Sequence, residues 1–501
     1  MELLSHLALG FETALSLTNL FYCLAGVALG TAIGVLPGLG PVPTIAMLLP
    51  ITFGLPPVSS LIMLSGIYYG AQYGGSTTAI LVNLPGESSS VVTALDGYQM
   101  ARKGRAGPAL ATAAIGSFVA GTLATVLIAL FSPALANVAL QFGPAEYFSL
   151  MVLGLIASIV LASGGLLHAL GMVLLGLLLG TVGTDLNSGM TRFTFGTIGL
   201  FEGINFVVLA VGIFGIGEIV ANLENATSRD VMSTKVTGLM PTRSDLRRIV
   251  GPILRGTGIG SILGILPGGG ATLSSFTSYA IEKKLSRTPE AFGKGAIEGV
   301  AGPESANNAG AQVSFIPMLT LGIPSNPVMA LMIGAMTIQG IQPGPSVMTE
   351  QPALFWGIIV SMWIGNLMLL VLNLPLVGLW ARMILVPYRF LFPIILSFCA
   401  IGVFSVSNST FDVWLMAGFG VVGYIFRKLD CEPAPLILAF ILGPMIEEYL
   451  RRALLLADGD PAVFVQRPLS LSLLILAGLL LAAVLLPSVR KTRETAFEEE
   501  A

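Results

Sequence analysis

Long apolar runs alternate with short polar or Pro/Gly-rich loops along almost the whole chain. A run of about 17–25 apolar residues is long enough to cross a bilayer as a helix. In the first half of the chain such runs lie near 58–84, 108–135, 146–162, 165–182 and 198–222. In the second half they lie near 310–338, 352–379, 388–404, 411–426, 433–447 and 468–487. The pattern predicts an all-α polytopic membrane protein with about 10–12 membrane spans.

Two further apolar stretches, 17–54 and 249–280, are each interrupted by a proline among glycines. Their phrases, Gly34-Val-Leu-Pro-Gly-Leu-Gly40 and Gly264-Ile-Leu-Pro-Gly-Gly-Gly270, lie 230 positions apart. Proline and clustered glycines end a helix, and broken helices at membrane depth need protein or a water-filled cavity to satisfy their backbone. A matched pair of breaks in two halves of a chain indicates a secondary transporter's binding site. We therefore expect two broken, re-entrant helical hairpins.

The distribution of basic residues predicts the orientation of the chain in the membrane. Lys and Arg gather in segments that we expect in the cytoplasm: 102–105, 223–248, 283–294, 427–428 and 490–493. The loops 136–145 and 340–351 have no Lys or Arg and are expected outside. Five crossings separate the two hairpins, and because five is odd, the two repeats should be inverted. The N-terminus is then outside and the C-terminus cytoplasmic.

The same pattern predicts how the chain is divided. We expect a first transmembrane repeat over 1–222, with its broken hairpin near 17–54. A cytoplasmic linker over 223–248 leads to a second repeat over 249–450, with its broken hairpin near 249–280. A final membrane span and a charged cytoplasmic tail fill 451–501.

Composition supports the membrane class and excludes several others. The chain is 54% hydrophobic and only 10% charged, whereas a soluble domain carries about 25% charge. It has no G-x-x-x-x-G-K-[ST] loop for an ATP-driven pump and no basic patches with interleaved aromatics for nucleic acid. Its two histidines, His6 and His168, rule out a multi-His metal site. Since no catalytic pair is well formed, an intramembrane enzyme is the weaker hypothesis, and we expect no enzymatic activity.

A set of phrases in fixed order carries a family resemblance. They are Gly34-Val-Leu-Pro-Gly-Leu-Gly40, Asn83-Leu-Pro-Gly-Glu87, Thr93-Ala-Leu-Asp-Gly97, Lys103-Gly-Arg-Ala-Gly107, Arg192-Phe-Thr-Phe-Gly196, Leu266-Pro-Gly-Gly-Gly270, Gly302-Pro-Glu-Ser-Ala-Asn-Asn308 and Leu321-Gly-Ile-Pro324. With them the chain resembles, over essentially its whole length, the large permease subunit (TctA) of the bacterial tripartite tricarboxylate transporters. One departure is that Ser325-Asn326 follows Gly-Ile-Pro, where glycine is expected.

The resemblance implies partners and a mode of action. A periplasmic substrate-binding protein would deliver a small organic di- or tricarboxylate, citrate-like, and a small membrane subunit would assist. The large subunit would import the substrate across the bacterial inner membrane by symport with an ion gradient. The coupling ion is sodium or a proton, and no cofactor is expected. A homodimer is left open, as are a carboxylate channel and a non-transporting scaffold subunit as alternative functions. Inverted hairpins favour alternating access with an elevator-like motion.

For the substrate's carboxylates, the glycine-rich breaks offer backbone amides at helix N-termini, where the helix dipole favours anions. Cations at the bilayer centre are costly, and these segments contain no Lys or Arg. The predicted substrate-binding residues are Pro37, Gly38, Gly40, Thr44, Pro267, Gly268, Gly269, Gly270, Thr272 and Ser274. Alternatively, the glycines only allow helices to approach closely, as small residues do in membranes.

A second group of uncharged oxygens lies within apolar surroundings and ends in breaks at Pro85 and Pro324, 239 positions apart. Such oxygens suit a hard monovalent cation such as sodium. The residues predicted to bind substrate or coupling ion are Ser76, Thr77, Thr78, Asn83, Glu304, Asn307, Asn308 and Ser325. Helix capping and interhelical hydrogen bonding are the alternative roles, and Glu304 in particular would cap a helix that begins near Ser305. Glu87 and Asp96 are interpreted as loop and turn residues.

Overall fold

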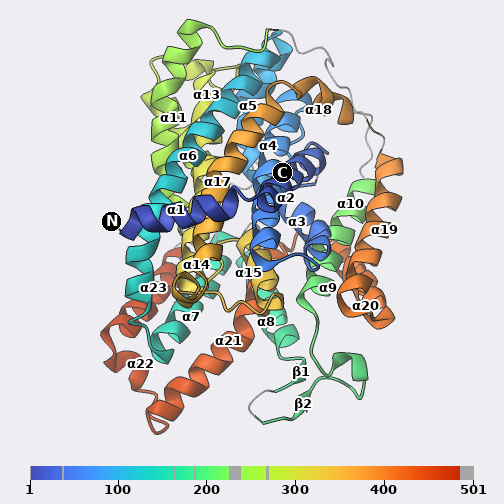
Figure 1. Ribbon diagram of the computed structural model, residues 1–501, viewed down its shortest axis with the longest axis vertical. Helices are drawn as coiled ribbons and strands as arrows, with labels where there is room; N and C mark the ends of the chain where they lie inside the picture. Colours follow the sequence, from blue (N-terminus) through green and yellow to red (C-terminus); the bar gives the residue numbers. More distant parts are fainter. Residues whose placement is uncertain are drawn as a thin grey trace.

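The computed structural model describes residues 2–36, 39–162, 165–185, 188–224, 238–266, 270–384, 386 and 388–485. These residues are almost entirely helical, which confirms the all-α polytopic class (Figure 1). Among the described helices, three are long and apolar enough to cross a membrane on their own: α2, α6 and α17. Several shorter apolar helices accompany them. The span count and the inverted orientation stay predictions.

The helices follow the expected apolar runs closely. In the first half they are α1 (Glu2–Ala14), α2 (Leu17–Gly34), α3 (Pro41–Leu48), α4 (Pro57–Val82), α5 (Val91–Arg102), α6 (Ala106–Ala139), α7 (Pro144–Leu161), α8 (Leu166–Gly180), α9 (Phe206–Ala210) and α10 (Gly217–Glu224). In the second half they are α11 (Arg243–Leu263), α12 (Gly270–Leu285), α13 (Glu298–Val313), α14 (Phe315–Leu321), α15 (Pro327–Ile338), α16 (Ser346–Glu350), α17 (Pro352–Asn373), α18 (Val377–Met383), α19 (Tyr388–Ser407), α20 (Thr410–Lys428), α21 (Ala434–Leu456), α22 (Val463–Gln466) and α23 (Pro468–Leu485).

The two expected broken stretches each form a pair of helices, α2 with α3 and α11 with α12. In each pair the break falls at the Pro-Gly phrase, since α2 ends at Gly34 and α11 ends at Leu263. The linker predicted at 223–248 falls between α10 and α11, and its residues 225–237 lie outside the described residues, as do 486–501 of the predicted tail. Nothing in the helix order tests the predicted domain boundaries further.

Glycines bring α2 against α4 and α11 against α13. A Cβ on Gly30 would lie 2.3 Å from the Ile67 carbonyl oxygen of α4, and one on Gly260 would lie 2.3 Å from the Ala306 oxygen of α13. One turn to either side of Gly30, Gly26 and Gly34 approach the α4 backbone about as closely. Gly256 and Gly264 approach the α13 backbone in the same way, on either side of Gly260. The backbones approach this closely because these positions have no side chain. The alternative role for glycine, close helix packing, therefore applies to the stretch before each break.

The contact pairs repeat at two constant offsets. Gly260 follows Gly30 by 230 positions, and its partner Ala306 follows Ile67 by 239. The ends of α4 and its counterpart agree with this second offset, because Asn83 (φ 56°) and Gly322 (φ 70°) both adopt the left-handed conformation that ends a helix. The two halves of the chain thus share a helix-packing unit, α2–α3–α4 and α11–α12–α13–α14.

In the second half of the chain, two expected helix boundaries are wrong. The run 310–338 is not one helix, because Gly322 is left-handed and Pro324 lacks an amide proton, so α14 ends at Leu321 and α15 begins at Pro327. Moreover, α13 already begins at Glu298. Glu304 therefore lies inside α13 and does not cap a helix beginning near Ser305.

The last expected span of the first half, 198–222, also begins later than predicted. Residues before α9 form a small antiparallel hairpin, β1 (Gly183–Thr184) with β2 (Thr191–Arg192), in which Gly183 is paired with Arg192. The helix starts at Phe206, where the Asn205 side chain accepts a hydrogen bond from Val207 N at 2.9 Å. A π-helical turn, Val211–Ile216, then joins α9 to α10.

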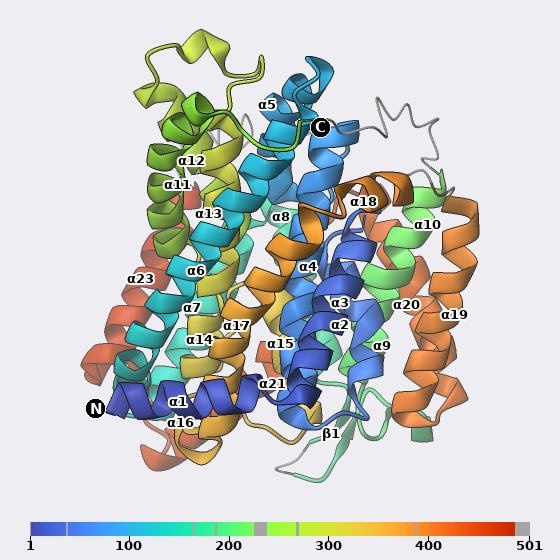
Figure 2. The same cartoon turned by 45° about the horizontal axis from the view of Figure 1, so that its top comes forward.

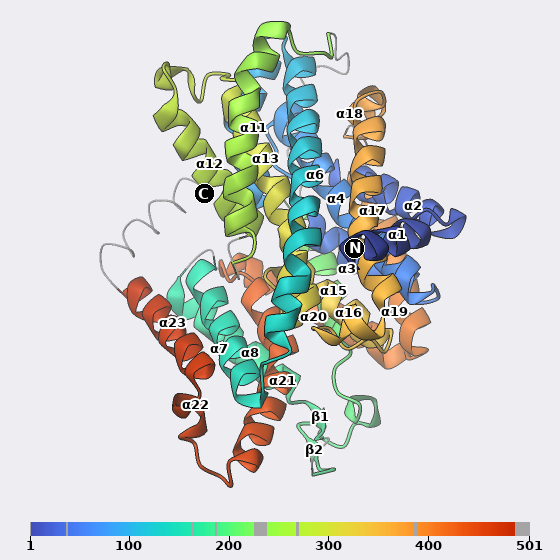
Figure 3. The same ribbon diagram turned by 60° about the vertical axis from the view of Figure 1, so that its left-hand side comes forward.

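The figures show how these helices are arranged. In Figures 1 and 2, α1 lies across α17 at a steep angle, unlike most of the other long helices. Figure 3 shows α11, α12 and α13 beside α6, while α7, α8, α21 and α23 gather as a separate bundle. The largest buried apolar cluster lies around α4, with side chains from α3, α14, α15 and α17, including the fully buried Phe315, Phe355 and Trp356. The hairpins thus lie against a core formed by both halves of the chain.

Candidate functional site

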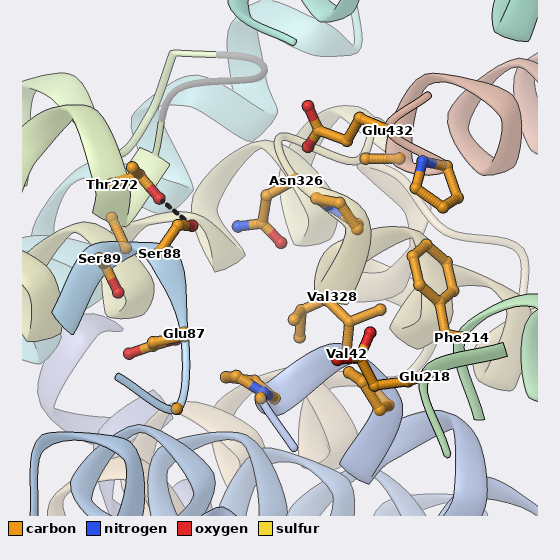
Figure 4. A pocket seen from close by; sticks show the side chains of 18 of the residues that line it. Val42, Glu87, Ser88, Ser89, Phe214, Glu218, Thr272, Asn326, Val328 and Glu432 are labelled. Carbon is orange, nitrogen blue, oxygen red and sulfur yellow. Dashed lines mark hydrogen bonds between the residues drawn. The ribbon is translucent and has the colours of Figure 1, made fainter. Parts of the chain in front are cut away.

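A cleft of about 750 Å³ lies where elements of both halves meet (Figure 4). It is bordered by the first residues of four helices: α3 at Gly40–Pro43, α12 at Gly270–Thr272, α15 at Asn326–Val328 and α21 at Pro433–Ala434. The turn Glu87–Ser89 before α5 also borders it. All four termini direct the positive end of a helix dipole toward one space. The amides that can serve as donors exclude those of Pro41, Pro43 and Pro327, which have no proton, and that of Met329, which donates to Asn326.

Local sequence explains why helices begin at this cleft. Gly40 is extended before Pro41, and Asn326 is extended before Pro327, so each proline occupies the first helical position, where its missing amide proton costs nothing. The Asn326 Oδ1 atom also accepts a hydrogen bond from Met329 N at 2.9 Å. Glu87 begins the turn Ser88–Ser90 through its backbone, since its amide donates to Ser90 Oγ at 3.4 Å and its carbonyl oxygen accepts from Ser90 N at 3.1 Å. Breaks in the chain and helix starts therefore coincide at the cleft.

The cleft is built from equivalent positions of the two halves. Glu87 and Asn326 are 239 positions apart, as are Tyr68 and Asn307. Asn307 Nδ2 donates a hydrogen bond to Glu87 Oε1 at 3.0 Å, and the equivalent residues Tyr68 and Asn326 both line the cleft. The Ser88 and Thr272 hydroxyls, also from different halves, lie 3.1 Å apart. In Figure 4, Glu87, Ser88, Thr272 and Asn326 lie on one side, and Val42, Val328 and Phe214 on the other.

Charge at the cleft is sparse and mostly acidic. Of the described residues that line it, Arg427 is the one cationic side chain, and it is ion-paired with Glu218. The hydroxyl, amide and carboxylate groups of Ser88, Thr272, Asn326 and Glu87 lie elsewhere on the lining. A bound anion would therefore be met mainly by helix N-termini and neutral donors, because the single guanidinium already has a carboxylate partner.

The predicted substrate-binding residues divide into three groups. Gly40, Gly270 and Thr272 line the cleft. Thr44 and Ser274 lie one turn further along, where their hydroxyls donate to the carbonyl oxygens of Gly40 (2.8 Å) and Gly270 (2.6 Å). Both are fully buried, and they stabilise the first turn of α3 and α12. The remaining predicted residues, Pro37, Gly38, Pro267, Gly268 and Gly269, lie outside the described residues.

Part of the set predicted to bind substrate or ion lies around a second, smaller cavity. Ser76, Thr77 and Glu304 line a small internal cavity of about 20 Å³ between α4, α6, α13 and α17. Asn308 donates from Nδ2 to the Ser117 hydroxyl of α6 at 2.6 Å, and Ser117 lines the same cavity. Asn307, one residue earlier on α13, reaches Glu87 in the cleft instead. The structure thus brings together residues that are about 230 positions apart in the sequence.

Three predicted residues have local structural roles. The Thr78 hydroxyl donates to the Gly75 carbonyl oxygen at 2.8 Å within α4. Asn83 is exposed and ends α4 in the left-handed conformation. The Ser325 hydroxyl donates to the Ser314 carbonyl oxygen at 3.3 Å. None of the three lines either cavity. Thr78 bonds within its helix, Asn83 ends one, and Ser325 ties the loop after α14 to the residue before that helix.

Asp96 and Glu87, both interpreted from sequence as loop or turn residues, differ in the structure. Asp96 is fully buried and accepts hydrogen bonds from Gly295 N (2.7 Å) and Ala296 N (2.8 Å), which fixes the loop before α13. Glu87 begins a turn but also lines the cleft. Sequence reasoning missed further lining residues: Tyr68, Gln72, Ser88, Ser89, Asn326 and Arg427. The offset of 239 positions was the signal that could have linked Asn326 to Glu87.

Comparison with known proteins gives the family. The model of the tripartite tricarboxylate transporter TctA family matches residues 20–438. An uncharacterized 52.8 kDa protein in the TAR-I ttuC' 3' region of Agrobacterium vitis is 62% identical over 500 residues, covering 100% of both chains. An uncharacterized protein in the TAR-II ttuC' 3' region of the same organism is 59% identical over 241 residues, covering 48% of this chain and 100% of the relative. No solved structure matches the chain.

The family match agrees with the architecture. Apolar helices identify a membrane protein, and the family is one of transporters assembled with other subunits, such as a substrate-binding protein and a small membrane subunit. The phrases noted in the sequence, from Gly34 to Pro324, fall within the matched residues. The chain belongs to the tripartite tricarboxylate transporter TctA family.

Proposed function

We propose that this protein is the ion-coupled permease that imports a small organic di- or tricarboxylate through the cleft between its two halves. The observation that carries the proposal is the convergence of helix N-termini on the cleft, from α3 in one half and from α12 and α15 in the other. Half-helix N-termini directed at an anionic substrate are a recurring arrangement in secondary transporters. A volume of about 750 Å³ also suits a small ligand.

Recognition without an unpaired Lys or Arg suits a substrate that must be released. A carboxylate held by Lys or Arg at membrane depth would be bound tightly and would leave a costly cation behind. Amides at helix ends attract the anion through partial charges, each stabilising by a few tenths to about 1 kcal/mol. Several such ends, with the hydroxyls of Ser88 and Thr272, would bind two or three carboxylates and still exchange them.

Alternating access would move a transport unit built from both halves against a static scaffold. The cleft is lined by Arg427, Asp430 and Glu432, from the segment whose basic residues predict a cytoplasmic location. On this basis we assign the conformation as open toward the cytoplasm. The rings of Tyr68, Tyr69 and Phe315 form a cluster in which every pair of ring centroids lies within 6.3 Å. This cluster would close the cleft on the side away from the cytoplasm. The paired units α2–α3 and α11–α12 are the elements that we expect to move, in an elevator-like manner.

The test is uptake into proteoliposomes that contain this chain and its small membrane subunit. A panel of radiolabelled carboxylates is offered with and without the cognate binding protein, and with an imposed sodium or proton gradient. Accumulation above equilibrium that requires the gradient and the binding protein is the expected result. Equilibration without accumulation would indicate a channel, and no flux with any carboxylate would indicate a scaffold subunit.

Thr272→Val supplies a local comparison in the same assay. Valine has nearly the same shape as threonine but no hydroxyl, so it removes the 3.1 Å contact with Ser88 without filling the cleft. We expect a higher carboxylate concentration for half-maximal uptake. Thr320→Val is the matched control, because the buried Thr320 hydroxyl donates to Ile316 O within α14 and lines neither cavity.

A further inference from the structure

We infer that the small internal cavity behind the cleft is a binding site for one monovalent cation, with the Glu304 carboxylate and the Asn373 carbonyl oxygen as ligands. This inference rests on the proposed function, because it gives the coupling ion a location separate from the substrate. The cavity lies between α4, α6, α13 and α17, and its volume is about 20 Å³. That is room for about one water-sized particle.

The Glu304 carboxylate is buried without a compensating positive charge. Its side chain is 1% exposed, and it accepts hydrogen bonds from Ser76 Oγ (2.7 Å, to Oε2) and Thr93 Oγ1 (2.5 Å, to Oε1). Among the ion pairs of the described residues, none involves Glu304. Ionisable groups at membrane depth normally pair with an opposite charge, since an isolated one is costly.

A second buried group in the cavity lacks a partner. Asn373, at the end of α17, is 7% exposed, and its Nδ2 donates to Leu369 O at 2.9 Å. Its Oδ1 atom is buried with no hydrogen-bond partner, although Asn373 lines the cavity together with Glu304, Ser76, Thr77 and Ser117. A buried carbonyl oxygen without a partner is unfavourable, because it has lost its hydrogen bonds to water and gained none in return. The cavity therefore contains two unsatisfied groups: a negative charge without a counter-ion and a carbonyl oxygen without a hydrogen-bond donor.

A single cation satisfies both groups at once. A proton on Glu304 would remove the charge, but the Asn373 oxygen would then need the new O–H or a water molecule as its donor. A water molecule would serve Asn373 but leave the carboxylate uncompensated. A small cation bound between the two oxygens neutralises the carboxylate and uses the carbonyl lone pair, with the Ser76, Thr77 and Ser117 hydroxyl oxygens nearby. Oxygen ligands of this kind suit hard cations.

The single negative charge of the cavity lining matches one monovalent cation. Glu304 is the one carboxylate that lines the cavity, and the described residues contain no group of three or more His, Cys, Asp or Glu side chains able to hold a metal ion. Divalent calcium sites generally use several carboxylates. One carboxylate balances one positive charge, so sodium is the probe of choice.

The cation site is connected to the substrate cleft through α13 and α5. Asn307, three residues after Glu304 on α13, donates to Glu87 in the cleft at 3.0 Å. Thr93, which donates to Glu304, lies in the first turn of α5, directly after the turn that Glu87 begins. A cation at Glu304 would therefore fix both elements that position Glu87, which gives a direct structural route from ion binding to substrate binding.

The test measures sodium binding by the purified full-length chain without any carboxylate. The midpoint of thermal unfolding is followed against NaCl, with choline chloride holding the ionic strength constant. Because a ligand that binds only the folded state stabilises it increasingly, with the logarithm of its concentration above the Kd, sodium should raise the midpoint. Glu304→Gln and Asn373→Leu should each weaken the apparent sodium affinity about tenfold or more.

Matched controls separate binding from general damage. Asn19 is 7% exposed, like Asn373, and Glu146 is 2% exposed. Neither lines the cavity. Asn19→Leu and Glu146→Gln should keep the wild-type sodium dependence. Asn373→Asp adds a second carboxylate and should shift the preference from sodium toward calcium, which tests the site even if Glu304→Gln does not fold.

Two results would overturn the inference: a sodium dependence that Glu304→Gln and Asn373→Leu leave unchanged, or a wild-type protein that sodium does not stabilise. If carboxylate nevertheless accumulates on a gradient, the proposed function stands and the cation is elsewhere or is a proton. If sodium binds at this cavity but no carboxylate is moved, the site stands and the proposed function fails.

Discussion

Asn307 Nδ2 donates a hydrogen bond to Glu87 Oε1 at 3.0 Å, and this contact joins α13 of the second half to the turn before α5 in the first. The two residues are 220 positions apart in the sequence. Glu87 lines the cleft, and Asn307 follows the buried Glu304 by less than one helical turn. The hydrogen bond therefore holds an acidic side chain of the cleft in place from the neighbouring half.

Asn307→Ala should weaken substrate binding without preventing insertion. Loss of a hydrogen bond to a charged group costs about 1.5–3 kcal/mol, so the carboxylate concentration for half-maximal uptake should rise roughly tenfold to a hundredfold. Asn19→Ala is the control, because Asn19 bonds Ser59 and Thr13 and does not line the cleft. An unchanged requirement for carboxylate in Asn307→Ala would show that this contact does not serve the substrate site.

Ser88 and Thr272 offer a reversible lock between the two halves. Their hydroxyl oxygens are 3.1 Å apart, so a cysteine at each position should form a disulfide, or be bridged by a short reagent, in this conformation. If transport needs the halves to separate here, oxidation should abolish uptake and a reducing agent should restore it. Cys431 lines the same cleft and must first be replaced by serine.

Each single-cysteine variant serves as the control for the lock. Oxidation of Ser88→Cys or Thr272→Cys alone should leave uptake unchanged. Full uptake by the cross-linked double variant would mean that α12 and the turn at Ser88 move together during transport, as parts of one moving unit.

Gly260→Ala should destabilise the protein, whereas Gly258→Ala on the same helix should not. A Cβ on Gly260 would meet the Ala306 carbonyl oxygen at 2.3 Å, while one on Gly258 has nothing within 4 Å. Forcing α11 away from α13 should cost about 1–3 kcal/mol. At Gly258, alanine's better helix propensity should be neutral or stabilising by up to about 1 kcal/mol. Thermal unfolding in detergent measures both, and equal midpoints would contradict the close α11–α13 contact.

Arg255→Leu should destabilise the α11–α12 pair more than the double variant Arg255→Leu/Glu282→Gln. Arg255 holds Glu282 by two hydrogen bonds of 2.6 and 2.7 Å, and the Glu282 side chain is only 2% exposed. Removing the guanidinium leaves a buried charge without a partner, at a cost of about 1–3 kcal/mol. Neutralising Glu282 should recover part of that loss. The comparison again uses thermal unfolding, and identical losses would show that the carboxylate reaches solvent.

Much of the architecture could be predicted because its signals are local. The length of the apolar runs placed α4, α6, α7, α20 and α23 to within a few residues. The repeated Pro-Gly phrases placed the ends of α2 and α11 and the starts of α3 and α12. Proline and glycine act on the backbone of their own segment, so such breaks can be read without knowing the neighbours.

The errors arose where one signal had to be weighed against another. The apolar composition of 310–338 suggested a single helix, but Gly322 and Pro324 divide it. Pro303 suggested a helix start near Ser305, yet it is tolerated inside α13, which begins at Glu298. Pro303 lies five residues after Glu298, beyond the first four amides that lack a helical partner, so α13 continues through it with one backbone hydrogen bond missing.

The sequence by itself determined that this is a helical membrane protein of two related halves, each with a broken hairpin, because run length, basic loops and repeated breaks are properties of consecutive residues. Only the tertiary structure decided which polar side chains meet. Asn373 from α17 shares a cavity with Glu304, and Asn326 shares the cleft with Glu87. These contacts depend on how helices far apart in the chain pack against each other, and that packing is set by the shapes of many side chains at once.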